Sequence, residues 1–108
     1  MSSIVFGNDR PYAKKIVLEC PTGYRMELDQ MIEDLIADGV AFVGVMGVDC
    51  SHVEDLIDEF VVGDGLDDTR FILTSSHPDE SLDEVADFAR ALSRPEHTGD
   101  IQVVRLPR

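Results

Sequence analysis

The sequence VAFVGVMGV, residues 40–48, contains no charged or polar side chain over its whole length. A strand that helices cover on both faces has this continuous apolar character, whereas a strand with one face in water alternates apolar and polar residues. We therefore expect residues 40–48 to form a strand near the centre of a parallel sheet.

Three more short apolar runs indicate the other strands of this sheet. They are residues 15–20 (KIVLEC), 70–75 (RFILTS) and 101–106 (IQVVRL). In the last run Gln102 and Arg105 interrupt the apolar positions, which is typical of an edge strand. Residues 3–6 (SIVF) are largely apolar, and they predict a short additional strand.

Segments with helical periodicity separate the strands. Residues 24–38 place apolar side chains on one helical face and carboxylates elsewhere, which predicts an amphipathic helix. Ser51 with Glu54, and Ser81 with Glu84, each have the spacing of a capping box, in which two side chains satisfy the first free amides of a helix. We expect a second and a third helix to begin at these two boxes.

The resulting element order is β-α-β-α-β-α-β, in which single helices connect parallel strands through right-handed crossovers. It predicts a three-layer α/β sandwich of Rossmann-like or flavodoxin-like type, with a four-stranded, mainly parallel sheet. The strand order 3-2-1-4 puts the apolar second strand inside the sheet and places the first two helices on one face and the third on the other. The order 2-1-3-4 is the alternative. A chain of 108 residues predicts one domain, residues 1–108.

Negative charge is concentrated in the middle of the chain. The formal net charge is −13, and residues 26–92 hold 18 of the 22 carboxylates but only two basic residues, Arg70 and Arg90. Such a field repels bare nucleic acid and anionic membranes and attracts basic protein surfaces. We therefore expect a basic protein partner, no direct nucleic-acid contact and no membrane contact. The carboxylates expected to contact the partner are Glu54, Asp55, Asp58, Glu59, Asp67, Asp68, Asp83 and Asp87.

The carboxyl ends of the strands are the usual place for a site in an open parallel sheet. Both cysteines and two of the three histidines lie in the loops expected there. The enzymatic alternative is a thiolate of Cys20 or Cys50, with His52 or His77 as its base. These residues do not have the spacing of common zinc motifs, and the chain has no GxGxxG fingerprint, so we predict no metal and no cofactor.

One of these loops resembles a known phosphate loop. The strand KIVLEC followed by Pro21, Thr22 and Gly23 resembles the Cys-x-x-Gly loop of the B components of the sugar phosphotransferase system. In that family the cysteine carries a phosphoryl group, so the resemblance implies a phosphocarrier role for Cys20. The resemblance covers about twenty residues, and Pro21 removes one backbone amide donor from the loop.

The leading hypothesis is a non-enzymatic binding protein. In charge, size and architecture the chain is similar to bacterial immunity proteins and nuclease inhibitors, whose acidic surfaces block basic nucleic-acid-binding clefts. The similarity is one of class, without an aligned motif, and it implies an inhibitor of a basic toxin or nucleic-acid-binding protein. A small-molecule sensor with a pocket at the carboxyl edge of the sheet is a third class.

The sequence also gives an expectation for location. No apolar run reaches the ~20 residues of a membrane span, and residues 1–6 lack the features of a secretory signal. We therefore expect a cytoplasmic protein with both cysteines reduced, and the similarity to immunity proteins implies a bacterial one. The oligomeric state does not follow from the sequence.

Overall fold

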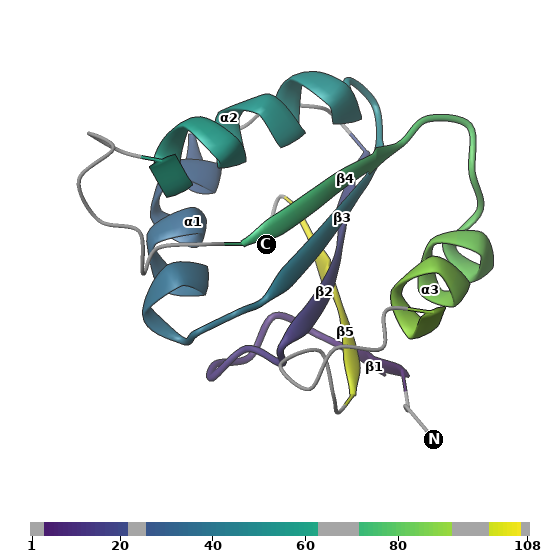
Figure 1. The fold of residues 1–108 in the computed structure, drawn as a ribbon, viewed down its shortest axis with the longest axis horizontal. Coiled ribbons are helices and arrows are strands. Elements are labelled where there is room, and N and C mark those ends of the chain that lie inside the picture. The colour runs from purple at the N-terminus through teal and green to yellow at the C-terminus, as the bar shows by residue number, and fades with distance from the viewer. Residues whose placement is uncertain (1–3, 22–25, 63–71, 92–99, 107–108) are drawn as a thin grey trace.

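The computed structural model describes residues 4–21, 26–62, 72–91 and 100–106. Within these residues it contains strands and helices that alternate along most of the chain (Figure 1). In chain order they are β1 (Ile4–Phe6), β2 (Lys15–Cys20), α1 (Glu27–Ala37), β3 (Phe42–Gly47), α2 (Cys50–Val62), β4 (Leu73–His77), α3 (Leu82–Ala91) and β5 (Ile101–Arg105).

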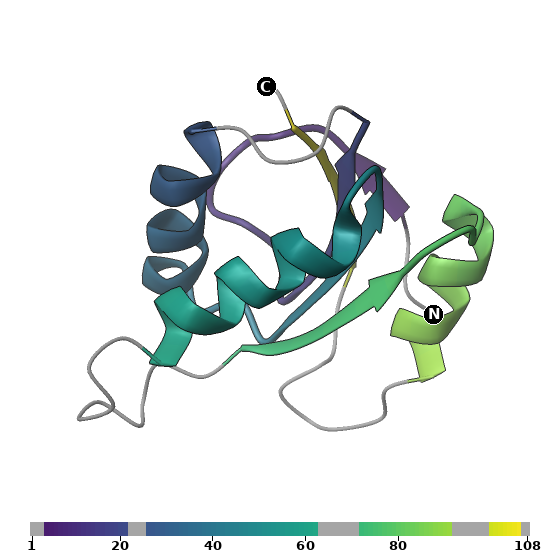
Figure 2. The ribbon, with the colours of Figure 1, turned by 90° about the horizontal axis from the view of Figure 1, so that it is seen from above.

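The strands form one parallel sheet in the order β1-β5-β2-β3-β4. The four strands expected from the longer apolar runs keep the predicted order 3-2-1-4, and β1 adds a fifth strand beside β5. Helices α1 and α2 cover one face of the sheet and α3 covers the other (Figures 1 and 2). The architecture is a three-layer α/β sandwich.

The prediction that residues 101–106 form an edge strand is wrong. Strand β5 lies between β1 and β2, and its polar residue Gln102 is buried. The Gln102 Nε2 donates to the carbonyl oxygens of Gly7 (2.9 Å) and Asp9 (3.0 Å), and its Oε1 accepts from the Ala13 N–H (2.9 Å). Gln102 therefore satisfies the backbone of the connection from β1 to β2, which explains a polar residue inside the sheet.

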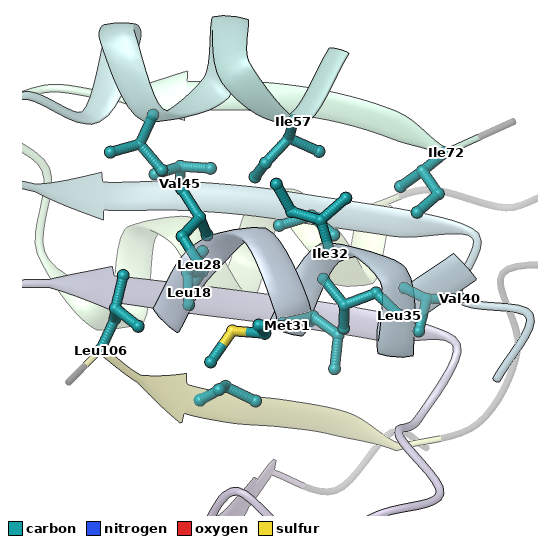
Figure 3. Close-up of a cluster of buried hydrophobic side chains, with 14 of the residues drawn as sticks. Leu18, Leu28, Met31, Ile32, Leu35, Val40, Val45, Ile57, Ile72 and Leu106 are labelled. Carbon is teal, nitrogen blue, oxygen red and sulfur yellow. The ribbon is translucent and has the colours of Figure 1, made fainter. Parts of the chain in front are cut away.

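The larger hydrophobic core lies between the sheet and the layer of α1 and α2. Helix α1 contributes four fully buried side chains from one face, as its periodicity predicts: Leu28, Met31, Ile32 and Leu35. They pack against Leu18 and Val45 of the sheet and beside Ile57 of α2 (Figure 3). Burial of these side chains contributes about 1.5–3 kcal/mol each, so this core fixes the two helices on the sheet.

A smaller cluster fixes α3 on the opposite face. Val85 and Ala89 of α3 pack against Val17 and Phe42 of the sheet. The predicted capping box at the start of α3 is confirmed. Ser81 Oγ accepts from the Glu84 N–H at 3.2 Å, and Glu84 Oε1 accepts from the Ser81 N–H at 3.4 Å.

The capping box predicted for α2 is wrong. The helix begins at Cys50, and the carbonyl of Asp49 accepts a hydrogen bond from the Val53 N–H at 3.1 Å. Asp49 has a positive φ of 59°, a conformation that aspartate adopts more readily than most residues. Ser51 and Glu54 consequently lie inside the helix and cannot cap its start.

Candidate functional site

Both cysteines lie at the carboxyl edge of the sheet, but they are buried. Cys20 ends β2 and is 0% exposed, and Cys50 opens α2 and is 3% exposed. Burial, with a smaller contribution from Cys50, raises the pKa of the Cys20 thiol to about 12. A nucleophilic thiolate needs a lowered pKa, so Cys20 has the opposite of the property that the enzymatic alternative requires.

The sheet separates these cysteines from His77. Cys20 and Cys50 belong to the core under α1 and α2. Side chains alternate along β4, so Ser76 faces α2, where its Oγ accepts from Ser51 Oγ at 3.4 Å. His77 faces α3, and its ring packs edge-on against Phe88 with centroids 5.0 Å apart.

His52 is also separate from His77. It lies in the first turn of α2 with an exposed ring, and its Nδ1 is 3.2 Å from Oδ2 of Asp49. Among the residues that the structure describes, neither histidine is hydrogen-bonded to a cysteine. The predicted combination of a cysteine nucleophile and a histidine base is therefore not assembled.

His77 is instead the middle member of a hydrogen-bonded chain that the sequence analysis missed. Its Nε2 lies 2.6 Å from Oγ of Ser75, and its Nδ1 lies 3.1 Å from Oε2 of Glu80. Residues two apart on a strand point to the same face, so the spacing of Ser75 and His77 was a usable signal. It was missed because the strand was predicted over residues 70–75, whereas β4 extends to His77.

The acidic surface is most extensive on α1 and α2, which contact each other on one face of the sheet. Four carboxylates lie on each helix: Glu27, Asp29, Glu33 and Asp34 on α1, and Glu54, Asp55, Asp58 and Glu59 on α2. Neither helix contains a lysine or an arginine. We name this pair of helices the acidic layer, because its own side chains include carboxylates but no lysine or arginine.

The carboxylates of α2 differ in their exposure. Asp55 and Glu59 are exposed, whereas Glu54 and Asp58 are half-buried. Asp58 Oδ1 accepts a hydrogen bond from Thr74 Oγ1 of β4 at 2.6 Å. Asp58 therefore also holds α2 against the edge strand of the sheet.

The other predicted contact residues do not share this surface. Asp83 and Asp87 are exposed on α3, which lies on the opposite face of the sheet, and Asp87 Oδ1 accepts from Arg90 Nη1 at 2.8 Å. Asp67 and Asp68 lie outside the described residues. The eight predicted contact residues therefore do not form a single continuous face.

Arg10 brings a positive charge to the end of the acidic layer. Its Nε and Nη2 donate to both carboxylate oxygens of Asp38 at 3.0 and 2.8 Å, and its Nη1 lies 3.4 Å from Oδ1 of Asp34. The Asp38 Oδ2 also accepts from the Tyr12 N–H at 3.0 Å. The hydrogen bond to Arg10 lowers the pKa of Asp38, with a smaller contribution from the Tyr12 N–H, and the same pair raises the pKa of Arg10.

A cavity of about 260 Å³ lies at the amino edge of the sheet, away from the cysteines. Its lining residues are Val5, Asp9, Arg10, Pro11, Ala13, Asp100 and Gln102. Arg10 and Gln102 already make hydrogen bonds inside the protein. Ligand pockets usually measure about 300–1,000 Å³ and have polar groups directed into them, so this cavity is a poor match for the small-molecule sensor hypothesis.

The described residues contain neither a metal-binding cluster nor a membrane-spanning helix. No group of three or more His, Cys, Asp or Glu side chains among them is arranged to hold a metal ion. In the same part of the chain, every helix is too short or too polar to cross a membrane.

The fold and the charge distribution define a small α/β protein with an acidic layer on one face. Residues 6–106 match the family described as a domain of unknown function (DUF7684), and because this match covers most of the chain, the protein belongs to that family. No curated protein matches the chain, and no solved structure matches it.

Proposed function

We propose that the protein is a non-enzymatic binding protein whose acidic layer docks on a basic protein surface. The observation that carries this proposal is the composition of α1 and α2, which have four carboxylates each and no lysine or arginine. A surface rich in carboxylates attracts basic protein surfaces and raises their association rates.

The partner in this proposal is a basic toxin or a nucleic-acid-binding protein, and the protein acts as an immunity or inhibitor protein in the bacterial cytoplasm. The acidic layer occupies the surface that nucleic acid would otherwise contact on the partner. The exposed carboxylates Asp55 and Glu59 make the first contacts, because they are four residues apart and lie on one side of α2. Asp58 adds charge but stays bonded to Thr74.

Two matched double variants test the position of the binding surface. Asp55→Lys with Glu59→Lys reverses two charges four residues apart on α2, and Asp83→Lys with Asp87→Lys makes the same change on α3. The net charge changes equally in both variants. Any difference between their association rates therefore comes from the face that carries the substitutions and not from the total charge.

The measurement has two stages. The wild-type protein, immobilised, captures its partner from an extract of the cells that make it, and association rates are then measured with the purified partner. Electrostatic steering raises association rates by about 10- to 1,000-fold, and it is screened over ~10 Å at 0.1 M salt. We expect the association rate to fall at least ~10-fold between 20 and 300 mM salt.

The α2 double variant should lower the association rate at low salt by at least ~10-fold, and the α3 double variant by no more than about 2-fold. An association rate that does not depend on salt, or equal losses in the two variants, would contradict the proposal. Recovery of an acidic partner would also contradict the proposal.

The alternative of a cysteine enzyme or phosphocarrier has less support. A phosphoryl donor must reach Cys20, whose side chain is 0% exposed, and the pKa of its thiol is raised by burial. Thr22 and Gly23, which contribute to the resemblance to the phosphotransferase loop, lie outside the described residues.

A further inference from the structure

The hydrogen-bonded chain of Ser75, His77 and Glu80 has the connectivity of a nucleophile, a base and an orienting acid. Ser75 Oγ is 2.6 Å from His77 Nε2, and His77 Nδ1 is 3.1 Å from Glu80 Oε2. Hydrogen-bond contact between nucleophile and base, and between base and a third group, is the geometric signature of nucleophilic catalysis.

The carboxylate decides which nitrogen of His77 carries the proton. An ionised Glu80 can only accept a hydrogen bond, so the neutral imidazole must present its N–H at Nδ1. The Nε2 atom then has a free lone pair that accepts the hydroxyl proton of Ser75. This is the tautomer that a general base for serine requires.

His77 is a buried base, and Ser75 beside it is a partly exposed residue. His77 is 5% exposed and its ring packs against Phe88. Ser75 is half-buried on β4, which forms one edge of the sheet. Phe88 is 43% exposed and offers apolar surface next to the chain, so this position suits small esters with an apolar acyl group.

We propose that Ser75 and His77 form an acyl-transfer site, with Glu80 as the positioning residue, and that the site acts on small esters. Ser75 Oγ attacks the ester carbonyl carbon while His77 Nε2 takes the hydroxyl proton. The carbon–oxygen bond to the alcohol breaks, and the alcohol leaves with the proton from His77. Water then attacks the acyl-serine, gives a proton to His77, and releases the carboxylic acid as that proton returns to Ser75.

This activity is independent of the binding proposed above, because the acidic layer lies on the opposite face of the sheet from His77. The same hydrogen bonds would also satisfy a histidine that is merely buried. The two roles differ in one measurable property, the reactivity of the Ser75 hydroxyl.

A fluorophosphonate probe measures this reactivity directly. Ser75 Oγ forms a bond to phosphorus, the phosphorus–fluorine bond breaks, fluoride leaves, and His77 takes the proton. Intact mass and peptide mapping should show one equivalent of probe on Ser75 in the folded wild-type protein, and Ser75→Ala should abolish labelling. Ser76→Ala is the matched control, because Ser76 faces α2, and its labelling rate should stay within about 2-fold of wild type.

Glu80→Gln separates a positioning role from a structural one. The glutamine amide can donate to Nδ1 and thereby favour the tautomer with its proton on Nε2, which cannot accept from Ser75. Because the Glu80 side chain is 39% exposed, the variant should keep the thermal midpoint of wild type while its labelling rate falls at least ~10-fold. Glu80→Asp should recover part of the rate. Absence of labelling at Ser75 in folded protein, or an unchanged rate in Glu80→Gln, would overturn the proposal.

Discussion

Replacing Gly47 with alanine tests how the carboxyl edge of the sheet is built. Gly47 ends β3 with a φ of +105°, and a Cβ atom there would lie 2.6 Å from the carbonyl oxygen of Cys20 and 2.9 Å from its carbonyl carbon. The Cys20 carbonyl is held by a hydrogen bond from the Val48 N–H at 2.9 Å. The backbone strain costs about 1–3 kcal/mol, and the overlap with β2 adds about 1–3 kcal/mol. We therefore expect Gly47→Ala to lower the free energy of unfolding by roughly 2–6 kcal/mol.

Gly7→Ala is the matched control for this substitution. Gly7 also has a positive φ, +140°, but no atom lies within 4 Å of a Cβ added there. Gly7→Ala should therefore show only the backbone strain, about 1–3 kcal/mol. Urea titrations of both variants would measure the difference, which should be about 1–3 kcal/mol with unchanged m-values. A loss in Gly47→Ala that equals or falls below the loss in Gly7→Ala would refute the steric reasoning.

Three further predictions concern the buried cysteines, the ion pair of Asp38 with Arg10, and the buried side chain of Gln102. A thiol reagent at pH 8 should react slowly with the native protein and rapidly with both cysteines in urea, because both thiols are buried and burial raises the pKa of Cys20 to about 12; rapid reaction of the native protein would contradict this burial. The lowered pKa of Asp38 gives stability that is present above its unfolded pKa of ~3.9 and is lost as pH falls through the folded pKa. As pH falls from 5 to 2, the thermal midpoint should thus fall less steeply in Asp38→Asn than in wild type. Parallel curves of thermal midpoint against pH for the two proteins would show that the pair with Arg10 contributes no stability. Gln102→Leu leaves two carbonyls and one N–H of the β1–β2 connection without their partner, which should cost about 2–4 kcal/mol in a urea titration; a loss under ~0.5 kcal/mol would show that water replaces the side chain.

The fold follows largely from signals that are local in the sequence. The apolar run at residues 40–48 predicts an interior strand, and β3 lies between β2 and β4. The amphipathic helix periodicity predicts the buried face of α1. A strand of a parallel sheet that is buried on both faces has a continuous apolar sequence. This pattern puts residues 40–48 inside the sheet, and the predicted strand order follows from that position.

The errors in the fold come from polar residues whose partners are distant in the sequence. In the sequence Gln102 indicates an edge strand, but its hydrogen-bond partners lie 89 to 95 residues earlier, in the β1–β2 connection. The sequence predicts that α2 starts at Ser51, but the helix starts at Cys50, after Asp49 with its positive φ, and no clear motif marks this start. Hydrogen bonds of this kind depend on tertiary structure, which periodicity does not encode.

The sequence predicts where the candidate site lies, but it does not predict which of its residues contact each other. Cys20, Cys50 and His77 do lie at the carboxyl edge of the sheet, as the topology implies. The cysteines and His77 do not contact each other, because neighbouring residues of a strand face opposite sides of the sheet. Ser76 and His77 are adjacent in the sequence, yet one contacts α2 and the other contacts α3.

The right-handed crossover connections separate the two halves of the predicted acidic surface. In the strand order 3-2-1-4, the first two helices lie on one face and the third on the other, so Asp83 and Asp87 could already be assigned to a different face from Asp55 and Glu59. The predicted contact set combines carboxylates from the whole middle of the chain, so it includes residues of both faces. This separation also makes the two proposals independent. The charge reversals on α2 should leave the labelling rate of Ser75 unchanged, and Ser75→Ala should leave association with a basic partner unchanged, because the sheet lies between the two sites.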